Sequence, residues 1–152
     1  MTRLEAFESL KAVQNEFRAA RFAVSVADRT AQLDPTTLPE EGESIRPSHL
    51  RDCLANLEAT YALRIFAEFE WVLRDFWHSV RPSPRVRQTR TEILVNRVAA
   101  RLSIPTATTD EVHQVREYRN QLAHRAGSVA TIALEDCRSA LGKFMSFLPL
   151  RW

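Results

Sequence analysis

A stretch from Ile65 to Trp77 places the tightest constraint on the fold of this 152-residue chain. It carries eight large apolar side chains: Ile65, Phe66, Phe69, Trp71, Val72, Leu73, Phe76 and Trp77. At the helical angle of 100° per residue they spread around most of the circumference, so this helix must be buried on several sides. We therefore expect it to be the central helix of a core or of a dimer interface. It should run from about residue 49 to residue 80, with Ser48 as its N-cap.

Apolar residues that recur at steps of three and four predict four further helices. They should cover residues 3–32, 91–102, 134–148 and a segment that starts with the capping box of Thr108 and Glu111 and contains residues 112–124. Prolines separate the first four segments and Gly127 follows the fourth, and only three glycines occur in the chain, which favours helices over turn-rich sheets. The sequence thus predicts an all-α bundle of five helices in a single domain, residues 1–152. Residues 34–47, rich in proline and acid, should form a solvated loop.

The charges are distributed unevenly along the chain. Residues 1–80 carry nine basic and thirteen acidic side chains, whereas residues 81–152 carry twelve basic and six acidic ones. Arg81, Arg85, Arg87 and Arg90 lie in a proline-containing segment without an acid. This segment is either a patch that attracts phosphate or a solvated loop.

The two cysteines indicate neither a disulfide nor a metal site. Cys53 and Cys137 lie far apart and beside apolar residues at helical spacing, so we expect both to be small buried residues in a reducing compartment. No Cys-x-x-Cys or His-x-x-x-His spacing occurs. The first eight residues mix acids with apolar residues, unlike a signal peptide, and no window is long and apolar enough to span a bilayer. We expect a cytoplasmic protein.

Near the end of the fourth predicted helix, Arg119, Asn120 and His124 form a compact set of groups suited to a phosphodiester. A guanidinium is a planar, permanently charged fork for phosphate oxygens, and an imidazole transfers protons near neutral pH. Asn120 could hold either partner in place. The alternative is structural, because cations at a helix C-terminus complement its macrodipole.

Arg119-Asn120-x-x-x-His124, late in a small all-helical chain and after a long aromatic-rich helix, resembles the signature of the HEPN superfamily. The resemblance covers most of the chain and implies a five-helix domain that homodimerises and joins two copies of the motif in one groove. It also implies a metal-independent endoribonuclease without a cofactor, acting as a toxin or phage-defence effector, with an antitoxin or regulatory protein as a possible partner. Some toxin members have a tyrosine two positions after the histidine, where this chain has Ala126, so the antitoxin remains open.

In such an enzyme Arg119, Asn120 and His124 would be catalytic. Two side chains would support them, Glu70 and Arg116, and three arginines would hold the RNA backbone, Arg125, Arg85 and Arg87. The alternative function is a non-catalytic HEPN-like module that binds RNA, a nucleotide or a protein.

The helical angle makes a prediction about Arg119. It falls inside the apolar arc of its helix and about 140° from His124. This inward arc is marked by Val112, Val115, Tyr118, Leu122 and Ala123. An inward guanidinium needs a buried acid or a bound anion, and Glu70 and Glu68 are the nearest candidates. Alternatively, both acids point to solvent. Because Arg119 and His124 do not stand side by side on the helix, a cleft lined by both must bend around the helix end or be completed by a second subunit.

Overall fold

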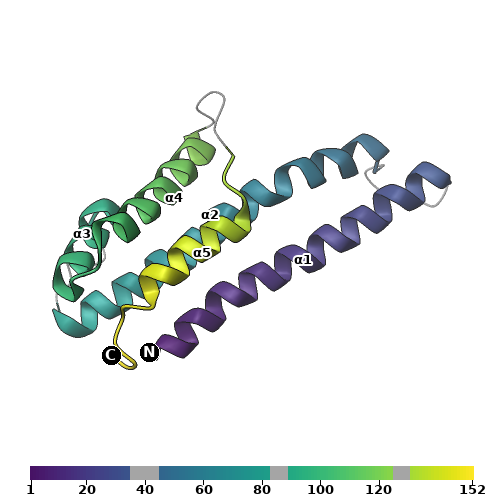
Figure 1. The fold of residues 1–152 in the computed structure, drawn as a ribbon. Coiled ribbons are helices and arrows are strands. Elements are labelled where there is room, and N and C mark those ends of the chain that lie inside the picture. Colours follow the sequence, from purple (N-terminus) through teal and green to yellow (C-terminus); the bar gives the residue numbers. More distant parts are fainter. Residues whose placement is uncertain (35–44, 83–88, 125–130) are drawn as a thin grey trace.

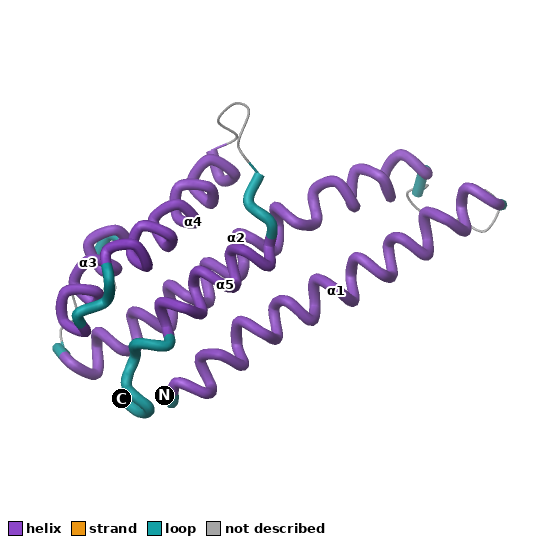
Figure 2. The backbone as a smooth tube through the Cα atoms, viewed as in Figure 1, coloured by secondary structure: helices purple, strands orange, loops and turns teal. Residues whose placement is uncertain are grey.

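The structure is a computed structural model that describes residues 1–34, 45–82, 89–124 and 131–152. These residues form five helices and no strand (Figures 1 and 2). The helices are α1 (Arg3–Leu33), α2 (Pro47–Val80), α3 (Thr91–Leu102), α4 (Thr106–His124) and α5 (Leu134–Met145). The predicted all-α class is confirmed. Most of the loop expected at residues 34–47 lies outside the described residues.

Helix α2 is the central element, because it packs against each of the other four helices. Its aromatic stretch supplies much of the core: Ile65, Phe66, Phe69, Val72 and Leu73 are fully buried, and Phe76 and Trp77 are nearly so. Phe69 stacks edge-on against Phe144 of α5 with ring centroids 5.6 Å apart. Trp71 differs from its neighbours, since 54% of its surface is exposed. The helices around α2 leave one narrow face uncovered, and Trp71 lies on it.

The first half of α2 and the second half of α1 project together beyond the other helices as a two-helix arm (Figure 1). Only one neighbouring helix flanks this part of α2, so its apolar residues Leu50, Leu54 and Leu57 are half-buried. Cys53 is exposed, contrary to the prediction, whereas Cys137 of α5 is buried as expected. The periodicity of Cys53 is helical, but no third helix among the described residues covers it.

Three predicted helix ends are wrong by a few residues. Helix α2 begins at Pro47 with Arg46 as its N-cap, instead of after Ser48, because proline at the first position needs no N–H partner. Helix α4 begins at Thr106, so Thr108 lies inside the helix and is buried. Helix α5 ends at Met145, and the buried Leu148 belongs to the turn that follows.

The corner between α3 and α4 orients the helix that carries the motif. Ser103 closes α3 with φ = 52°, a left-handed conformation. The N–H of Ile104 then donates to the carbonyl of Ala99 at 2.9 Å, which is the capping bond of a Schellman turn. Ile104 is buried, and the Pro105 carbonyl accepts from Thr108 and Thr109. This buried corner sets the direction of α4.

The two described ends of the chain lie side by side (Figure 1). Thr2 and Arg151 form an isolated antiparallel bridge, and the Arg3 guanidinium donates to the carbonyls of Ser146 and Leu148. Trp152 packs on the core as expected: its ring is edge-on to Phe76 at 5.8 Å, and its Nε1 donates to Asp75 at 2.8 Å.

Among the described residues no helix is both long and apolar enough to cross a bilayer.

Candidate functional site

Helix α4 positions the motif through its buried side. Val112, Val115 and Tyr118 are buried against the core, as predicted. Leu122, one turn further, is half-buried, and Ala123 is exposed although the pattern placed it inward. The last turn of α4 therefore extends past the core, so the helix end that carries His124 is more open than the sequence indicated.

Arg119 lies at the boundary between the core and solvent, with 35% of its side chain exposed. One terminal nitrogen is 3.4 Å from a carboxylate oxygen of Glu70, and the other donates to the Asn120 side-chain oxygen at 2.9 Å. The guanidinium carbon also lies 5.4 Å from the centre of the Phe66 ring, within the range of a cation–π contact. The expected pairing with an acid of α2 is confirmed, and Glu70 is that acid. These contacts hold the arginine fork in one orientation.

Glu70 is shared between two arginines. Its other carboxylate oxygen accepts from Arg74, whose second terminal nitrogen donates to the Thr89 carbonyl at 3.0 Å. The Glu70 side chain is only 16% exposed. Arg74 was not among the predicted site residues, although its spacing of four residues after Glu70 is that of a helical ion pair and could have revealed it. Glu70 and Arg74 thus connect α4 to the residues that precede α3.

Arg116 lies one turn before Asn120 on the same side of α4. Its guanidinium is 3.2 Å from Glu92 of α3 and 3.8 Å from Glu117, and its side chain is 19% exposed. Its Nε atom is buried without a hydrogen-bond partner within the described part of the chain. Because two acids already neutralise it, Arg116 fastens α4 to α3 as well as facing the motif.

A hollow of about 390 Å³ lies between the start of α3 and the second half of α4. It is lined by Arg90, Thr91, Glu92, Arg116, Arg119 and Asn120. Three of these side chains are arginines, and the first turn of α3 adds the positive end of a helix dipole. Glu92 is the one acid among the lining residues. The structure thus brings Arg116, Arg119 and Asn120 together around a space that is suited to an anion.

His124 is the last residue of α4 and is exposed. It does not line this hollow. Five residues separate it from Arg119, which on a helix places the two side chains about 140° apart. The structure therefore brings Arg119, Asn120, Arg116 and Glu70 together and leaves His124 beyond them, at the open end of the helix. Arg85, Arg87 and Arg125, which were expected to contact RNA, lie outside the described residues.

Two titratable side chains of α4 have displaced pKa values. Burial raises the pKa of Tyr118 above its usual 10.0, and the nearby Cys137 and Glu58 add to this. His113 faces Asn96 of α3 with 2.8 Å between Nε2 and the side-chain oxygen. Burial, and then repulsion from Arg116, lowers the pKa of His113 below its usual 6.5. His113 is therefore held neutral at physiological pH.

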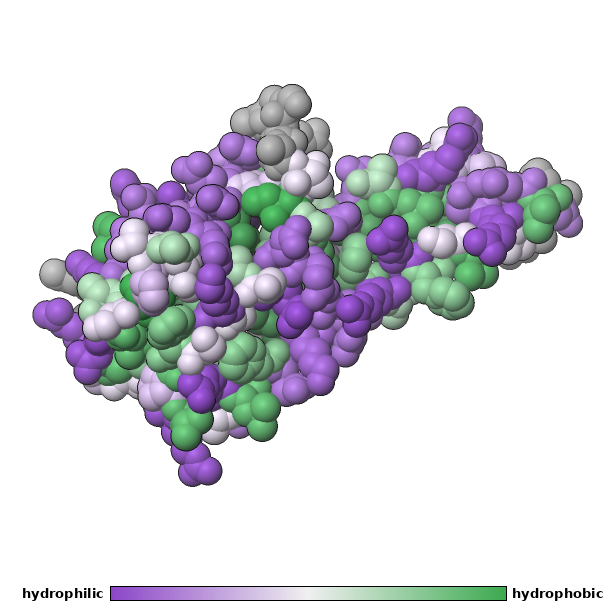
Figure 3. Space-filling model, in the orientation of Figure 1, coloured by the Kyte–Doolittle hydropathy of each residue, from purple (hydrophilic) through white to green (hydrophobic). Residues whose placement is uncertain are grey.

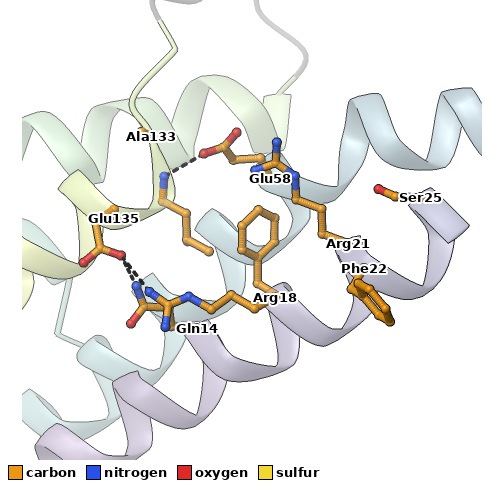
Figure 4. A pocket seen from close by; sticks show the side chains of 10 residues that line it. Gln14, Arg18, Arg21, Phe22, Ser25, Glu58, Ala133 and Glu135 are labelled. Atoms are coloured by element: carbon orange, nitrogen blue, oxygen red, sulfur yellow. Dashed lines mark hydrogen bonds and ion pairs between the residues drawn. The ribbon is translucent and has the colours of Figure 1, made fainter.

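A second hollow, of about 480 Å³, lies between α1, α2 and the start of α5 (Figure 4). Its polar groups serve the fold: Glu58 accepts from the Leu134 N–H at 3.0 Å and so caps α5, and Glu135 accepts from Gln14 and faces Arg18. Because Glu58 and Glu135 balance the charges of Arg18 and Arg21, this hollow lacks the excess of cations found beside α4.

In the described parts of the chain, no group of three or more His, Cys, Asp or Glu side chains could hold a metal ion. The relationship to known proteins was tested in three ways. No family model, no curated protein and no solved structure matches this chain.

Proposed function

We propose that the protein is a metal-independent endoribonuclease of the HEPN type, plausible as a toxin or phage-defence effector. The observation that carries this proposal is the hollow beside α4, where Arg90, Arg116 and Arg119 converge with Asn120. Guanidinium groups suit phosphate oxygens because their planar forks form paired, charge-assisted hydrogen bonds. Two of the motif residues, Arg119 and Asn120, thus line the hollow that has the most cationic side chains among the described residues.

Arg119 is suited to stabilise a phosphorane. Its bonds to Glu70 and Asn120 engage one N–H on each terminal nitrogen, and a guanidinium has five N–H donors in all. The remaining donors can meet phosphate oxygens without a change in the orientation of the fork. A donor that is already oriented stabilises developing charge at little reorganisation cost. Asn120 and Glu70 act as positioning residues in this scheme.

The chemistry requires a proton acceptor and a proton donor. The RNA 2′-hydroxyl attacks the adjacent phosphorus, its proton passes to one imidazole, the bond from phosphorus to the 5′-oxygen breaks, and an imidazolium protonates that leaving oxygen. The products are a 2′,3′-cyclic phosphate and a 5′-hydroxyl. His124 of two copies would supply both groups. Since Arg119 and His124 diverge on one helix, a composite site formed by a homodimer meets the geometric need.

The first test is RNA cleavage in EDTA. The expected result is cleavage of single-stranded RNA and no cleavage of DNA with the same sequence, which lacks the nucleophile. His124→Ala should lower the rate by a factor on the order of 10² to 10⁴, which is the usual contribution of a general acid or base. His78→Ala is the matched control, because His78 is also exposed in the last turn of a helix. Equal activity in the His124 variant would refute the mechanism.

A change at Arg119 must be tested for its effect on folding as well as on activity, because the ion pair of Arg119 with Glu70 also supports the fold. Arg119→Lys keeps the charge but loses the planar fork, so we expect a folded protein that is nearly inactive. In a composite site, mixing the unmodified protein with an excess of His124→Ala should also lower the activity per unmodified subunit, because each mixed dimer keeps only one of the two imidazoles that the reaction uses. Unchanged activity per unmodified subunit in such a mixture, with the variant folded and dimeric, would mean that each site lies within one chain.

One observation favours the alternative function, a non-catalytic module that binds RNA, a nucleotide or a protein. Arg119 and Arg116 already have carboxylate partners in Glu70 and Glu92. A module of this type would bind RNA without cleaving it, and the His124 variant would bind as well as the unmodified protein.

A further inference from the structure

Helix α1 has a second apolar stripe that no other helix covers. Its buried stripe faces the core through Leu10, Val13 and Phe17, as expected for an amphipathic helix. The large apolar residues of α1 that are exposed form a separate set: Leu4 at 69%, Phe22 at 72%, Val26 at 48% and Leu33 at 83%. Single exposed apolar residues are common on proteins. Four exposed apolar residues on the same side of one helix form a pattern that needs a structural reason.

These four residues share one face. At 100° per residue they fall within an arc of about 40°, centred about 170° from the buried stripe. Phe22 is one of the residues that line the hollow in Figure 4, and 72% of its surface is nevertheless exposed. Figure 1 shows α1 at the outer edge of the molecule, on the side away from α3 and α4, and Figure 3 shows apolar residues on the surface of the projecting arm. The stripe therefore faces solvent along the whole helix.

The spacing along this face is that of a coiled coil. Steps of three and four residues connect seven exposed positions: Ala12, Asn15, Ala19, Phe22, Val26, Arg29 and Leu33. This mean period of 3.5 residues is what keeps a seam directed at a partner helix over several turns. Five of the seven residues are apolar. We call this set the α1 seam.

We propose that the α1 seam is an interface at which α1 pairs antiparallel with α1 of a second copy of this chain. The charges beside the seam favour this occupant and this direction. Glu5 and Glu8 lie near its N-terminal end and Arg29 near its C-terminal end. In a parallel pair Glu8 would face Glu8 and Arg29 would face Arg29. An antiparallel pair avoids both of these contacts, and it places the Glu8–Lys11 ion pair of one copy beside Arg29 of the other, where Glu8 can interact with both cations.

The sizes of the side chains are also complementary in an antiparallel pair. With Ala19 placed opposite Phe22 of the second copy, each bulky ring meets a small residue on both sides of the two-fold axis, as in knobs-into-holes packing. The same register places Ala12 opposite Arg29 and Asn15 opposite Val26. Leu33 then lies within one turn of Leu4 of the second copy. The two helices overlap from residue 8 to residue 33, which is about 38 Å at 1.5 Å per residue.

This interface is independent of the proposed nuclease site. The α1 seam and α4 lie on opposite sides of the bundle (Figure 1), so pairing through α1 leaves the hollow beside α4 open. If the α4 ends also pair, as the proposed composite site requires, the chain can form assemblies larger than a dimer. Loss of the α1 contact should then halve the mass of the assembly and leave RNA cleavage intact.

The first test is the mass of the full chain in solution, measured by sedimentation equilibrium at micromolar concentrations. Phe22→Glu places a charge in the centre of the seam, and the mass should fall by half while the circular dichroism spectrum stays helical. Ile93→Glu is the matched control, because Ile93 is an exposed large apolar residue on α3 and should leave the mass unchanged. A monomeric unmodified protein, or an unchanged mass in the Phe22 variant, would overturn the proposal.

The second test addresses direction. Ala12→Cys and Arg29→Cys are made separately in a Cys53→Ser background, which removes the exposed native thiol. When the two proteins are mixed and mildly oxidised, an antiparallel pair should yield a disulfide between the two different variants, identified by mass spectrometry. Disulfides that join each variant only to itself would show a parallel pair and contradict the proposed arrangement.

Discussion

At the scale of single residues, the arrangement of the motif depends on Glu70. This carboxylate lies between the guanidiniums of Arg74 and Arg119 with 16% of its side chain exposed. A charge at this depth is tolerated because both of its oxygens are paired. Removing its charge would take away the carboxylate that the two guanidiniums share. Glu70 thus contributes to stability and also orients Arg119.

We predict that Glu70→Gln lowers the free energy of unfolding by about 1 to 2 kcal/mol, less than for a fully buried pair because both arginines reach solvent. Urea denaturation measures this change. Glu68→Gln is the matched control on the same helix and should change the stability by less than about 0.5 kcal/mol. If the Glu70 variant is as stable as the Glu68 variant, the ion pairs make no net contribution.

At the scale of elements, the contact between α3 and α4 includes a titratable group. His113 of α4 faces Asn96 of α3, and its Nδ1 is buried without a hydrogen-bond partner among the described residues. Because the folded-state pKa of His113 lies below 6.5, the unfolded chain binds a proton more readily than the folded chain. The contribution of His113 to stability is therefore complete above pH 6.5 and decreases as the pH falls below that value.

We predict that the protein loses stability between pH 7 and pH 5, and that His113→Gln reduces this loss because glutamine keeps a polar contact with Asn96 but does not titrate. Thermal unfolding at a series of pH values measures the effect. His78→Gln removes an exposed histidine and should leave the pH dependence as it is. An unchanged slope in the His113 variant would show that carboxylates alone cause the loss.

At the scale of the whole molecule, the segment after α5 joins the start of α1 to the end of α2. The Arg3 N–H donates to the Leu150 carbonyl at 3.1 Å, and Trp152 contacts both Phe76 and Asp75 of α2. These contacts connect residues that are far apart in sequence, so they depend on the assembled bundle.

We predict that Trp152→Ala lowers the free energy of unfolding by about 2 kcal/mol, because it removes an aromatic pair and a hydrogen bond to a carboxylate. Trp152→Phe should recover roughly the aromatic part of this loss. Trp71→Ala serves as the control, since Trp71 is half-exposed and its removal should cost less than about 0.5 kcal/mol. Chemical denaturation of the three variants, followed by circular dichroism, tests the order.

The sequence was sufficient to predict the number and class of the helices and most of the buried residues. Steps of three and four residues reveal which side of a helix is apolar, so Val112, Val115 and Tyr118 were placed correctly on the buried side of α4. The same rule was wrong for Cys53, Trp71 and Ala123, because periodicity shows the direction of a side chain and says nothing about whether another element lies there.

The candidate site, like the fold, was predictable from the sequence only in part. The sequence by itself determined that Arg119 points toward the core and needs an acid, because an inward guanidinium cannot lose its charge. It also determined that His124 lies on another side of the helix. Only the tertiary structure decided that the acid is Glu70, that Arg74 shares it, and that the start of α3 completes a cationic hollow. These contacts join residues from separate helices, and the packing of whole helices around α2 sets their distances.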